Sequence, residues 1–213
     1  MILSTIAVDM SNWSKDLTLE QGSDAWLSAR SRRLGGSEIA AVMRVSPYKT
    51  RRELWEEKTG QRDAPSISHL PHVKRGIDAE PIARDIIERT LHVKYETPVL
   101  TDLKHPWMAT SLDGLCDDHV LEIKTMSESK HNDTAWGWVP EHYELQVQWA
   151  MMIAHRPRGM FVSYRPEDKS IFWTWIERDE TRIRQMRKAA IEFWGWVEER
   201  IEPPEDFAWT PEV

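Results

Sequence analysis

The stretch Ser111-Leu112-Asp113-Gly114, followed after a short polar turn by Leu121-Glu122-Ile123-Lys124, decides the expected fold. We expect a strand that ends over residues 110–113, a turn over residues 114–119 and a second strand over residues 120–125. Successive side chains of a strand point to opposite faces, so Glu122 and Lys124 share one face while Leu121 and Ile123 point into a core. Ser111 and Asp113 share a face for the same reason. The hairpin therefore gathers two carboxylates and one ammonium group.

This combination of charges has a chemical use. Two carboxylates in close contact repel each other unless a cation lies between them. Oxygen ligands with free coordination positions suit a hard ion such as Mg²⁺. A lysine beside such an ion can orient an attacking water or stabilise charge on a phosphate. The pattern resembles the catalytic motif of the PD-(D/E)XK nucleases, with Leu112 in place of the proline. The same residue types also occur on amphipathic strands of purely structural role, so the rest of the chain has to decide.

Composition narrows the class of protein. The chain has 213 residues, enough for one nuclease domain over residues 1–213 with a sizeable core. No apolar run approaches the roughly 20 residues that a membrane span needs, and the first residues do not resemble a secretory signal. The single cysteine, Cys116, excludes a disulfide framework and a four-cysteine metal site. We expect a cytoplasmic protein.

The charge is unevenly distributed along the chain. The net charge is −7, but residues 1–75 hold 12 Lys and Arg against 9 Asp and Glu, while residues 76–213 hold 16 against 26. If the protein binds a polyanion, the N-terminal third is expected to provide much of the contact.

The pattern of apolar residues, caps and turns predicts the order of the elements. The expected helices cover residues 24–33, 38–43, 50–59, 71–89, 140–154 and 179–200. The expected strands cover residues 94–100, 107–113, 120–125, 159–164 and 170–176. Residues 128–137 are expected to form a polar loop, and the apolar stripe of the long helix is expected at Ile77, Ile82, Ile86 and Ile87. This order predicts an α/β fold with a central mixed β-sheet flanked by helices, as in the restriction-endonuclease-like PD-(D/E)XK core.

Three further segments occur in a fixed order around the core motif. Trp26-Leu27-Ser28-Ala29-Arg30 is followed by Gly35-Gly36-Ser37-Glu38, then by Gly76-Ile77-Asp78-Ala79-Glu80, and after the core motif by Tyr143-Glu144-Leu145-Gln146-Val147-Gln148. Together these four blocks resemble the lambda-exonuclease and YqaJ-like viral recombinase family over about residues 23–176. Any one block alone is a weak signal, whereas four in sequence are specific.

The resemblance implies an activity and a set of partners. It implies a processive exonuclease, dependent on Mg²⁺ with Mn²⁺ as a substitute, that degrades linear double-stranded DNA from its 5′ end. The product carries 3′ single-stranded overhangs for recombination by strand annealing. The resemblance further implies a ring-shaped homotrimer that works with a single-strand annealing protein.

The resemblance also implies residue roles. Asp113 and Glu122 hold the metal together with the backbone carbonyl of Ile123, Glu80 lies near the metal or its waters, and Lys124 acts on the nucleophilic water. The terminal 5′-phosphate is expected to be held by Arg30, Ser37, Ser111 and Gln146. Without the resemblance, Glu80 and Arg30 are more simply interpreted as solvated surface charges, and Gln146 fits a structural or a binding role equally.

Two alternative functions remain open at this point. One is a structure- or sequence-specific endonuclease of the same superfamily, because the core motif is common to both. The Arg30 and Ser37 block favours the exonuclease, since an enzyme directed to DNA ends needs an anion site for the terminal phosphate. The other alternative is a catalytically inactive DNA-binding module. The presence of Asp113, Glu122 and Lys124 at suitable spacing argues against it.

Overall fold

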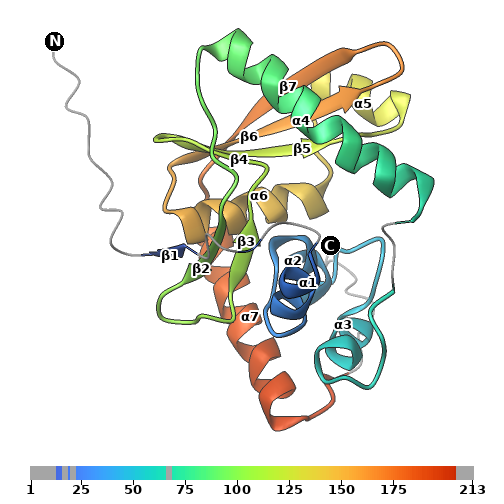
Figure 1. Cartoon of the computed structure of the whole chain (residues 1–213). Helices are drawn as coiled ribbons and strands as arrows, with labels where there is room; N and C mark the ends of the chain where they lie inside the picture. Colours follow the sequence, from blue (N-terminus) through green and yellow to red (C-terminus); the bar gives the residue numbers. More distant parts are fainter. Residues whose placement is uncertain (1–12, 16–18, 20–22, 66–68, 205–213) are drawn as a thin grey trace, which may run out of the picture.

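The computed structural model describes residues 13–15, 19, 23–65 and 69–204, whose arrangement is drawn in Figure 1. The strands are β1 (Trp13–Lys15), β2 (Val99–Asp102), β3 (Ala109–Ser111), β4 (Gly114–Leu115), β5 (His119–Lys124), β6 (Arg158–Arg165) and β7 (Ser170–Glu177). The helices are α1 (Asp24–Ser31), the 3-10 turn η2 (Gly36–Glu38), α2 (Ile39–Val42), α3 (Arg51–Lys58), α4 (Pro71–Leu91), α5 (Glu128–Ala135), α6 (Glu141–Ala154) and α7 (Glu180–Glu199).

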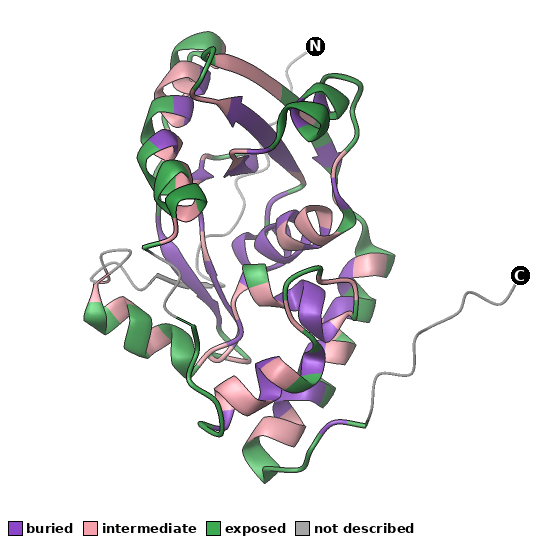
Figure 2. Cartoon of the chain, turned by 90° about the vertical axis from the view of Figure 1, so that its right-hand side faces the viewer, coloured by how far each residue is buried: buried purple, intermediate pink, exposed green. Residues whose placement is uncertain are grey.

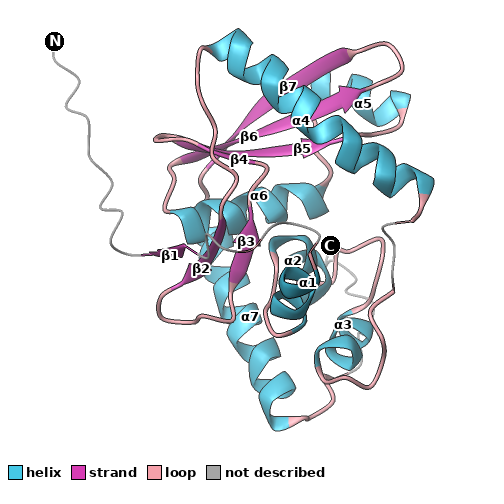
Figure 3. Ribbon diagram, in the orientation of Figure 1, coloured by secondary structure: helices cyan, strands magenta, loops and turns pink. Residues whose placement is uncertain are grey.

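The strands form two hydrogen-bonded sheets. The larger sheet has the order β4-β5-β6-β7, in which β5 and β6 run parallel and the other neighbours run antiparallel. The smaller sheet has the order β1-β2-β3 and is antiparallel throughout. Helices flank the larger sheet, with α4 and α6 in contact with β5 (Figure 3). The predicted α/β fold with a central mixed sheet is therefore confirmed.

Side-chain caps begin several helices where the sequence predicts them. The Ser23 hydroxyl accepts a hydrogen bond from the Trp26 amide at 3.2 Å and begins α1. Thr50 and Glu53 form a reciprocal capping box at α3. Asp179 accepts bonds from the first amides of α7. The predicted helices at these three positions are confirmed. The sequence predicts them well because a cap depends only on neighbouring residues.

The core has two parts, one on each face of the larger sheet. One part joins α6 to α2, α7 and the sheet, and includes Trp149, Phe161 and Phe193. The other joins α4 to β5 and β6. Buried residues accordingly lie on the strands and on the inward faces of the helices (Figure 2). Gly159 allows α6 to approach β6, since a Cβ atom there would lie 2.3 Å from Val147 Cγ1.

The predicted hairpin is wrong in its pairing. The strand that ends before Asp113 pairs with β2 in the smaller sheet, and the antiparallel partner of β5 is instead the two-residue strand β4. Gly114 explains the switch, because a Cβ atom there would lie 2.9 Å from both Leu121 and Tyr95 atoms. The glycine thus lets the chain pass closely over β5 directly after Asp113.

Three further expectations differ from the structure. Residues 128–137 are mostly helical, as α5, rather than a loop. The strand expected at residues 94–100 begins only at Val99. Before it, Glu96 pairs with Leu115 in an isolated bridge and belongs to no strand. On α4, Ile77 and Ile82 are 58% and 52% exposed, and the buried positions are Ala79, Ala83 and Ile87. Small alanines face the sheet because α4 packs closely on it.

None of the described helices has the length and apolar character that crossing a membrane requires.

Candidate active site

Strand β5 presents two charged side chains on the face that looks toward α6. Leu121 and Ile123 belong to the core part under α4, so the intervening Glu122 and the following Lys124 point to the opposite face, as the alternation predicts. Glu122 is only 3% exposed and forms an ion pair with Lys124. A buried carboxylate of this kind needs a charge partner or a metal, and Lys124 is that partner here.

Asp113 is fixed beside this pair by the backbone of β5. Its Oδ2 atom accepts a hydrogen bond from the Ile123 amide at 2.8 Å. The amide and the carbonyl of one strand residue point to the same strand edge, so the Ile123 carbonyl is expected on the side of Asp113. The chain turn at Gly114 thereby brings Asp113, Glu122 and the Ile123 backbone together.

Glu80 reaches the same place from α4. Its Oε1 atom accepts a hydrogen bond from Arg84 Nη1 at 2.9 Å, and Arg84 also donates to the backbone carbonyl of Asp113. Arg84 therefore connects the helix to the loop that carries Asp113. It is not among the residues that the sequence motifs single out, although its spacing of four from Glu80 on one helix is a usable signal.

The electrostatics of the cluster show that the carboxylates are crowded. Burial and the neighbouring Asp113 charge raise the pKa of Glu80, against the opposing effect of Arg84. Burial also raises the pKa of Glu122, with Asp113 adding to the shift and Lys124 opposing it. For Lys124, burial favours the neutral amine, but the charges of Glu122 and Asp113 outweigh it and raise the pKa. Lys124 is therefore held as a cation.

The donor set of this cluster fits a hard divalent cation. Glu80, Asp113 and Glu122 lie close enough to influence one another: burial raises the pKa of the two glutamates, the Asp113 charge adds to both shifts, and a cation would relieve this repulsion. Only oxygen atoms are offered, which favours Mg²⁺ or Mn²⁺ over softer metals.

A second group with metal-ligand chemistry lies at the other end of β5. The ligand atoms of Cys116, Asp118 and His119 lie within 4.8 Å of one another. Each already has protein partners: Asp118 pairs with Arg158, and the second ring nitrogen of His119 contacts the Tyr95 hydroxyl. Burial opposes the shift, but the hydrogen bonds from Arg158 and His119 lower the pKa of Asp118 to about 2. These contacts fix the β4–β5 turn and involve none of the carboxylates described above.

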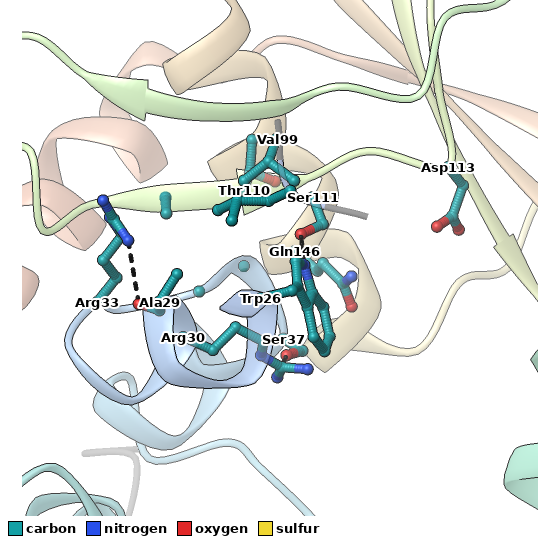
Figure 4. Close-up of a pocket in the computed structure, with 14 residues that line it drawn as sticks. Trp26, Ala29, Arg30, Arg33, Ser37, Val99, Thr110, Ser111, Asp113 and Gln146 are labelled. Carbon is teal, nitrogen blue, oxygen red and sulfur yellow. Dashed lines mark hydrogen bonds between the residues drawn. The ribbon is translucent and has the colours of Figure 1, made fainter. Parts of the chain in front are cut away.

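A pocket with a volume of about 190 Å³ lies next to Asp113 and is lined by residues from α1, η2, β3 and α6 (Figure 4). All four residues that the resemblance assigns to the 5′-phosphate line it, namely Arg30, Ser37, Ser111 and Gln146. Arg30 Nη2 donates to the Ser37 hydroxyl at 3.3 Å, and the Trp26 indole donates to the Ser111 hydroxyl at 3.2 Å. Asp113 forms part of the same wall, so the pocket opens beside the carboxylates.

The two glutamines of α6 have different roles. Gln148 is buried and uses both ends of its amide, donating to the Glu177 carbonyl at 2.8 Å and accepting from the Asp179 amide at 3.0 Å. It is a structural link between α6 and the start of α7. Gln146 is directed to the pocket and is the glutamine available to a ligand.

The fold and this arrangement of residues define a class, that of nuclease-fold proteins related to the alkaline exonucleases. The crystal structure of the alkaline exonuclease LHK-Exo from Laribacter hongkongensis superposes with a TM-score of 0.72 at 26% identity, covering 84% of this chain and 95% of that one. The same exonuclease has been solved in complex with dAMP. A phage-related exonuclease from Haemophilus somnus 129PT shares the fold at 11% identity, with a TM-score of 0.60 and coverage of 79% and 95%.

The sequence comparison names the family. The model of the YqaJ-like viral recombinase domain matches residues 25–157, and the chain belongs to this family. The uncharacterized protein YqaJ of Bacillus subtilis strain 168 is 26% identical over 180 residues, which is 83% of this chain and 56% of that protein. The chain thus spans about half the length of this curated relative.

Proposed function

We propose that this protein is a Mg²⁺-dependent exonuclease that digests the 5′ strand of linear double-stranded DNA and leaves 3′ single-stranded overhangs. One observation carries the proposal: the pocket that contains Arg30, Ser37, Ser111 and Gln146 shares Asp113 with the carboxylate cluster. An anion site beside a cluster of metal-binding type is what an enzyme that works from a phosphorylated end requires. The alkaline exonucleases of the same fold support the choice of activity.

The residues have distinct roles in this proposal. Asp113, Glu122 and the Ile123 carbonyl hold Mg²⁺, with Glu80 at the metal or its waters. The ion would supply Lewis-acid stabilisation of the scissile phosphate and a more acidic bound water. Lys124 orients the attacking water and, as a cation, stabilises negative charge that develops on the phosphate. Arg84 is a positioning residue, because it acts through Glu80 and the Asp113 backbone.

The pocket fixes the position of the strand end. Arg30 presents a planar guanidinium that suits two phosphate oxygens, and its Cζ atom lies 4.6 Å from the Trp26 ring centroid, which restricts its orientation. Ser37, Ser111 and Gln146 supply neutral donors around it. With the terminal phosphate held here, the next phosphodiester lies toward Asp113, and each cleavage exposes a new terminal phosphate for the same site.

The wider assembly belongs to the same proposal. A single domain over residues 1–213 would form a ring-shaped homotrimer that threads the DNA and digests it processively. A single-strand annealing protein would receive the overhang for phage-type recombination. The proposal places the enzyme in the cytoplasm, where its DNA substrate is found.

One digestion experiment separates this proposal from its alternatives. An end-labelled linear duplex and its closed-circular form are incubated with the protein in Mg²⁺ and in EDTA. The exonuclease digests only the linear form and only with the metal. Cutting of the circle would instead identify an endonuclease, and binding without any cutting would identify an inactive DNA-binding module.

A further inference from the structure

A large aromatic side chain lies exposed close to the carboxylate cluster. Tyr48, in the loop between α2 and α3, is 71% exposed. Its hydroxyl lies 3.2 Å from the Tyr143 hydroxyl, and the Tyr143 ring centroid lies 5.5 Å from Lys124 Nζ. Tyr48 is thus two contacts away from the residue that acts at the scissile phosphate.

Hydrogen bonds fix the backbone of the loop that carries Tyr48. The Ser46 hydroxyl accepts hydrogen bonds from the Tyr48 amide at 3.1 Å and the Lys49 amide at 3.3 Å, which closes the turn. Lys49 then pairs with Glu57 of α3 at 2.6 Å. A rigid, exposed aromatic ring loses little conformational freedom when a ligand stacks on it, and so suits recognition.

The underside of the ring is supported by α6. The His142 ring meets Tyr48 edge-on, with centroids 5.6 Å apart, and lies 4.1 Å from the Tyr143 ring. His142 Nε2 is buried and has no hydrogen-bond partner among the described residues. Buried polar atoms without partners are uncommon in folded proteins. The His142 ring supports Tyr48 by packing from the protein side and leaves the outer face of Tyr48 open.

Helix α6 also connects the ring to the anion pocket. Tyr143 and Gln146 are three residues apart on α6 and therefore lie on one side of the helix. Gln146 lines the anion pocket, and Tyr143 contacts both Lys124 and Tyr48. The anion pocket, Lys124 and Tyr48 are therefore all in contact with one side of α6.

We propose that Tyr48 is a stacking site for a nucleobase of the DNA strand whose phosphates lie at Lys124, with Tyr143 and His142 as its support. The inference rests on the proposed nuclease function and adds a contact to a base, where the phosphate pocket recognises only the backbone. Stacking on an aromatic ring tolerates any base, as a nuclease without sequence preference requires.

The test is a binding experiment in which the loss of the Tyr48 ring is combined with the loss of a single base. Wild type, Tyr48→Ala, Tyr48→Leu and Tyr48→Phe are titrated, in EDTA, against 5′-phosphorylated duplexes that carry one abasic nucleotide at successive positions from the 5′ end, and binding is followed by fluorescence anisotropy. On the intact duplex we expect Tyr48→Ala and Tyr48→Leu to weaken binding by about 5- to 100-fold. We expect Tyr48→Phe to stay within about twofold of wild type, because it keeps the ring.

The abasic series gives the decisive result. At one position, loss of the base should weaken wild type as much as Tyr48→Ala does, and should weaken Tyr48→Ala no further. Trp136→Ala removes a ring that is 89% exposed, on the loop after α5, and serves as the matched control with unchanged affinity. The inference would be overturned if Tyr48→Ala bound every duplex, intact or abasic, more weakly than wild type by the same factor. It would also be overturned if Tyr48→Phe lost as much affinity as Tyr48→Ala. Because binding is measured without turnover, a wild type that cuts no DNA would refute the proposed function separately.

Discussion

At the scale of single residues, the site of Glu80, Asp113 and Glu122 contains more carboxylates than the two cations Lys124 and Arg84 can neutralise. Lys124 lowers the pKa of both glutamates and Arg84 lowers that of Glu80, but burial and the Asp113 charge outweigh them and raise both pKa values. Such crowding destabilises the fold and is retained at sites that bind a cation or perform proton chemistry. The cluster is therefore interpreted as a place prepared for a divalent ion.

The first prediction concerns the three core residues of the site. Asp113→Asn, Glu122→Gln and Lys124→Ala should each lower the rate of digestion by at least about a hundredfold, because each removes a metal ligand or a preorganised charge. Lys124→Ala should retain Mg²⁺ binding, measured by calorimetry, while the two carboxylate variants should lose it. Glu167→Gln replaces an exposed carboxylate that pairs with Arg75 and is the matched control. Near wild-type turnover in any of the three variants would refute the assignment.

The second prediction concerns recognition of the strand end. Arg30→Ala should slow digestion of 5′-phosphorylated ends about 10- to 100-fold and hydroxyl ends much less, since a charge-assisted hydrogen bond contributes roughly 1.5–3 kcal/mol. Initial rates on the two kinds of end give the comparison. Arg32→Ala, an exposed neighbour outside the lining of this pocket, should leave the preference unchanged. If Arg30→Ala slowed both ends equally, Arg30 would contact only the DNA backbone.

At the scale of elements, the sequence predicts local features better than strand pairing. The caps at Ser23, Thr50 and Asp179 are local, and the helices that they begin are confirmed. The pairing of β3 with β2 depends on a contact between residues distant in sequence and on the close approach at Gly114, which no alternation pattern contains. The same limit explains α4, whose buried face contains the expected Ile87 but carries Ala79 and Ala83 in place of the expected Ile77 and Ile82.

The same difference between local features and contacts of distant residues applies to the site. Asp113, Glu122 and Lys124 lie together in the structure because one turn and one alternating strand bring them together, while their roles stay a prediction. Trp26 and Tyr48 are absent from the predicted set because their contacts with the site arise only from tertiary packing. Arg84 is also absent, although only its contact with the Asp113 carbonyl depends on tertiary packing and its contact with Glu80 is local. Trp26 is the clearest example, as its partner Ser111 lies 85 residues along the chain.

The third prediction tests how closely α6 and β6 pack. Gly159→Ala would place a Cβ atom 2.3 Å from Val147 Cγ1, so the helix or the strand must move. We expect a loss of about 1–3 kcal/mol in the free energy of unfolding, measured with urea. Gly195→Ala is the matched variant, because nothing lies within 4 Å of a Cβ at that position of α7. It should stabilise the protein by about 0.5–1 kcal/mol, and equal losses in both variants would refute the packing argument.

At the scale of the whole molecule, the net charge of −7 has to be reconciled with a polyanionic substrate. The cationic residues of the N-terminal third include Arg30 in the anion pocket, whereas residues 76–213, with 16 Lys and Arg against 26 Asp and Glu, have a net charge of −10. Weak overall attraction does not favour processive digestion by a single open subunit, since the enzyme would dissociate between cleavages. A closed ring keeps the duplex in place by its topology, without tight binding at any one contact.

The last prediction is therefore a homotrimer with a central channel. Several large aromatic side chains are exposed in the single chain, among them Trp173 and Trp175 of β7, and an assembly offers them a partner surface. Light scattering at working concentration should give three times the 25.0 kDa mass of the chain. Digestion should continue on the first duplex after an excess of unlabelled duplex is added as a trap, because the ring cannot exchange substrate without reaching an end. A monomeric mass together with unchanged digestion under the trap would refute the ring, since an open subunit would then remain on its substrate without enclosing it.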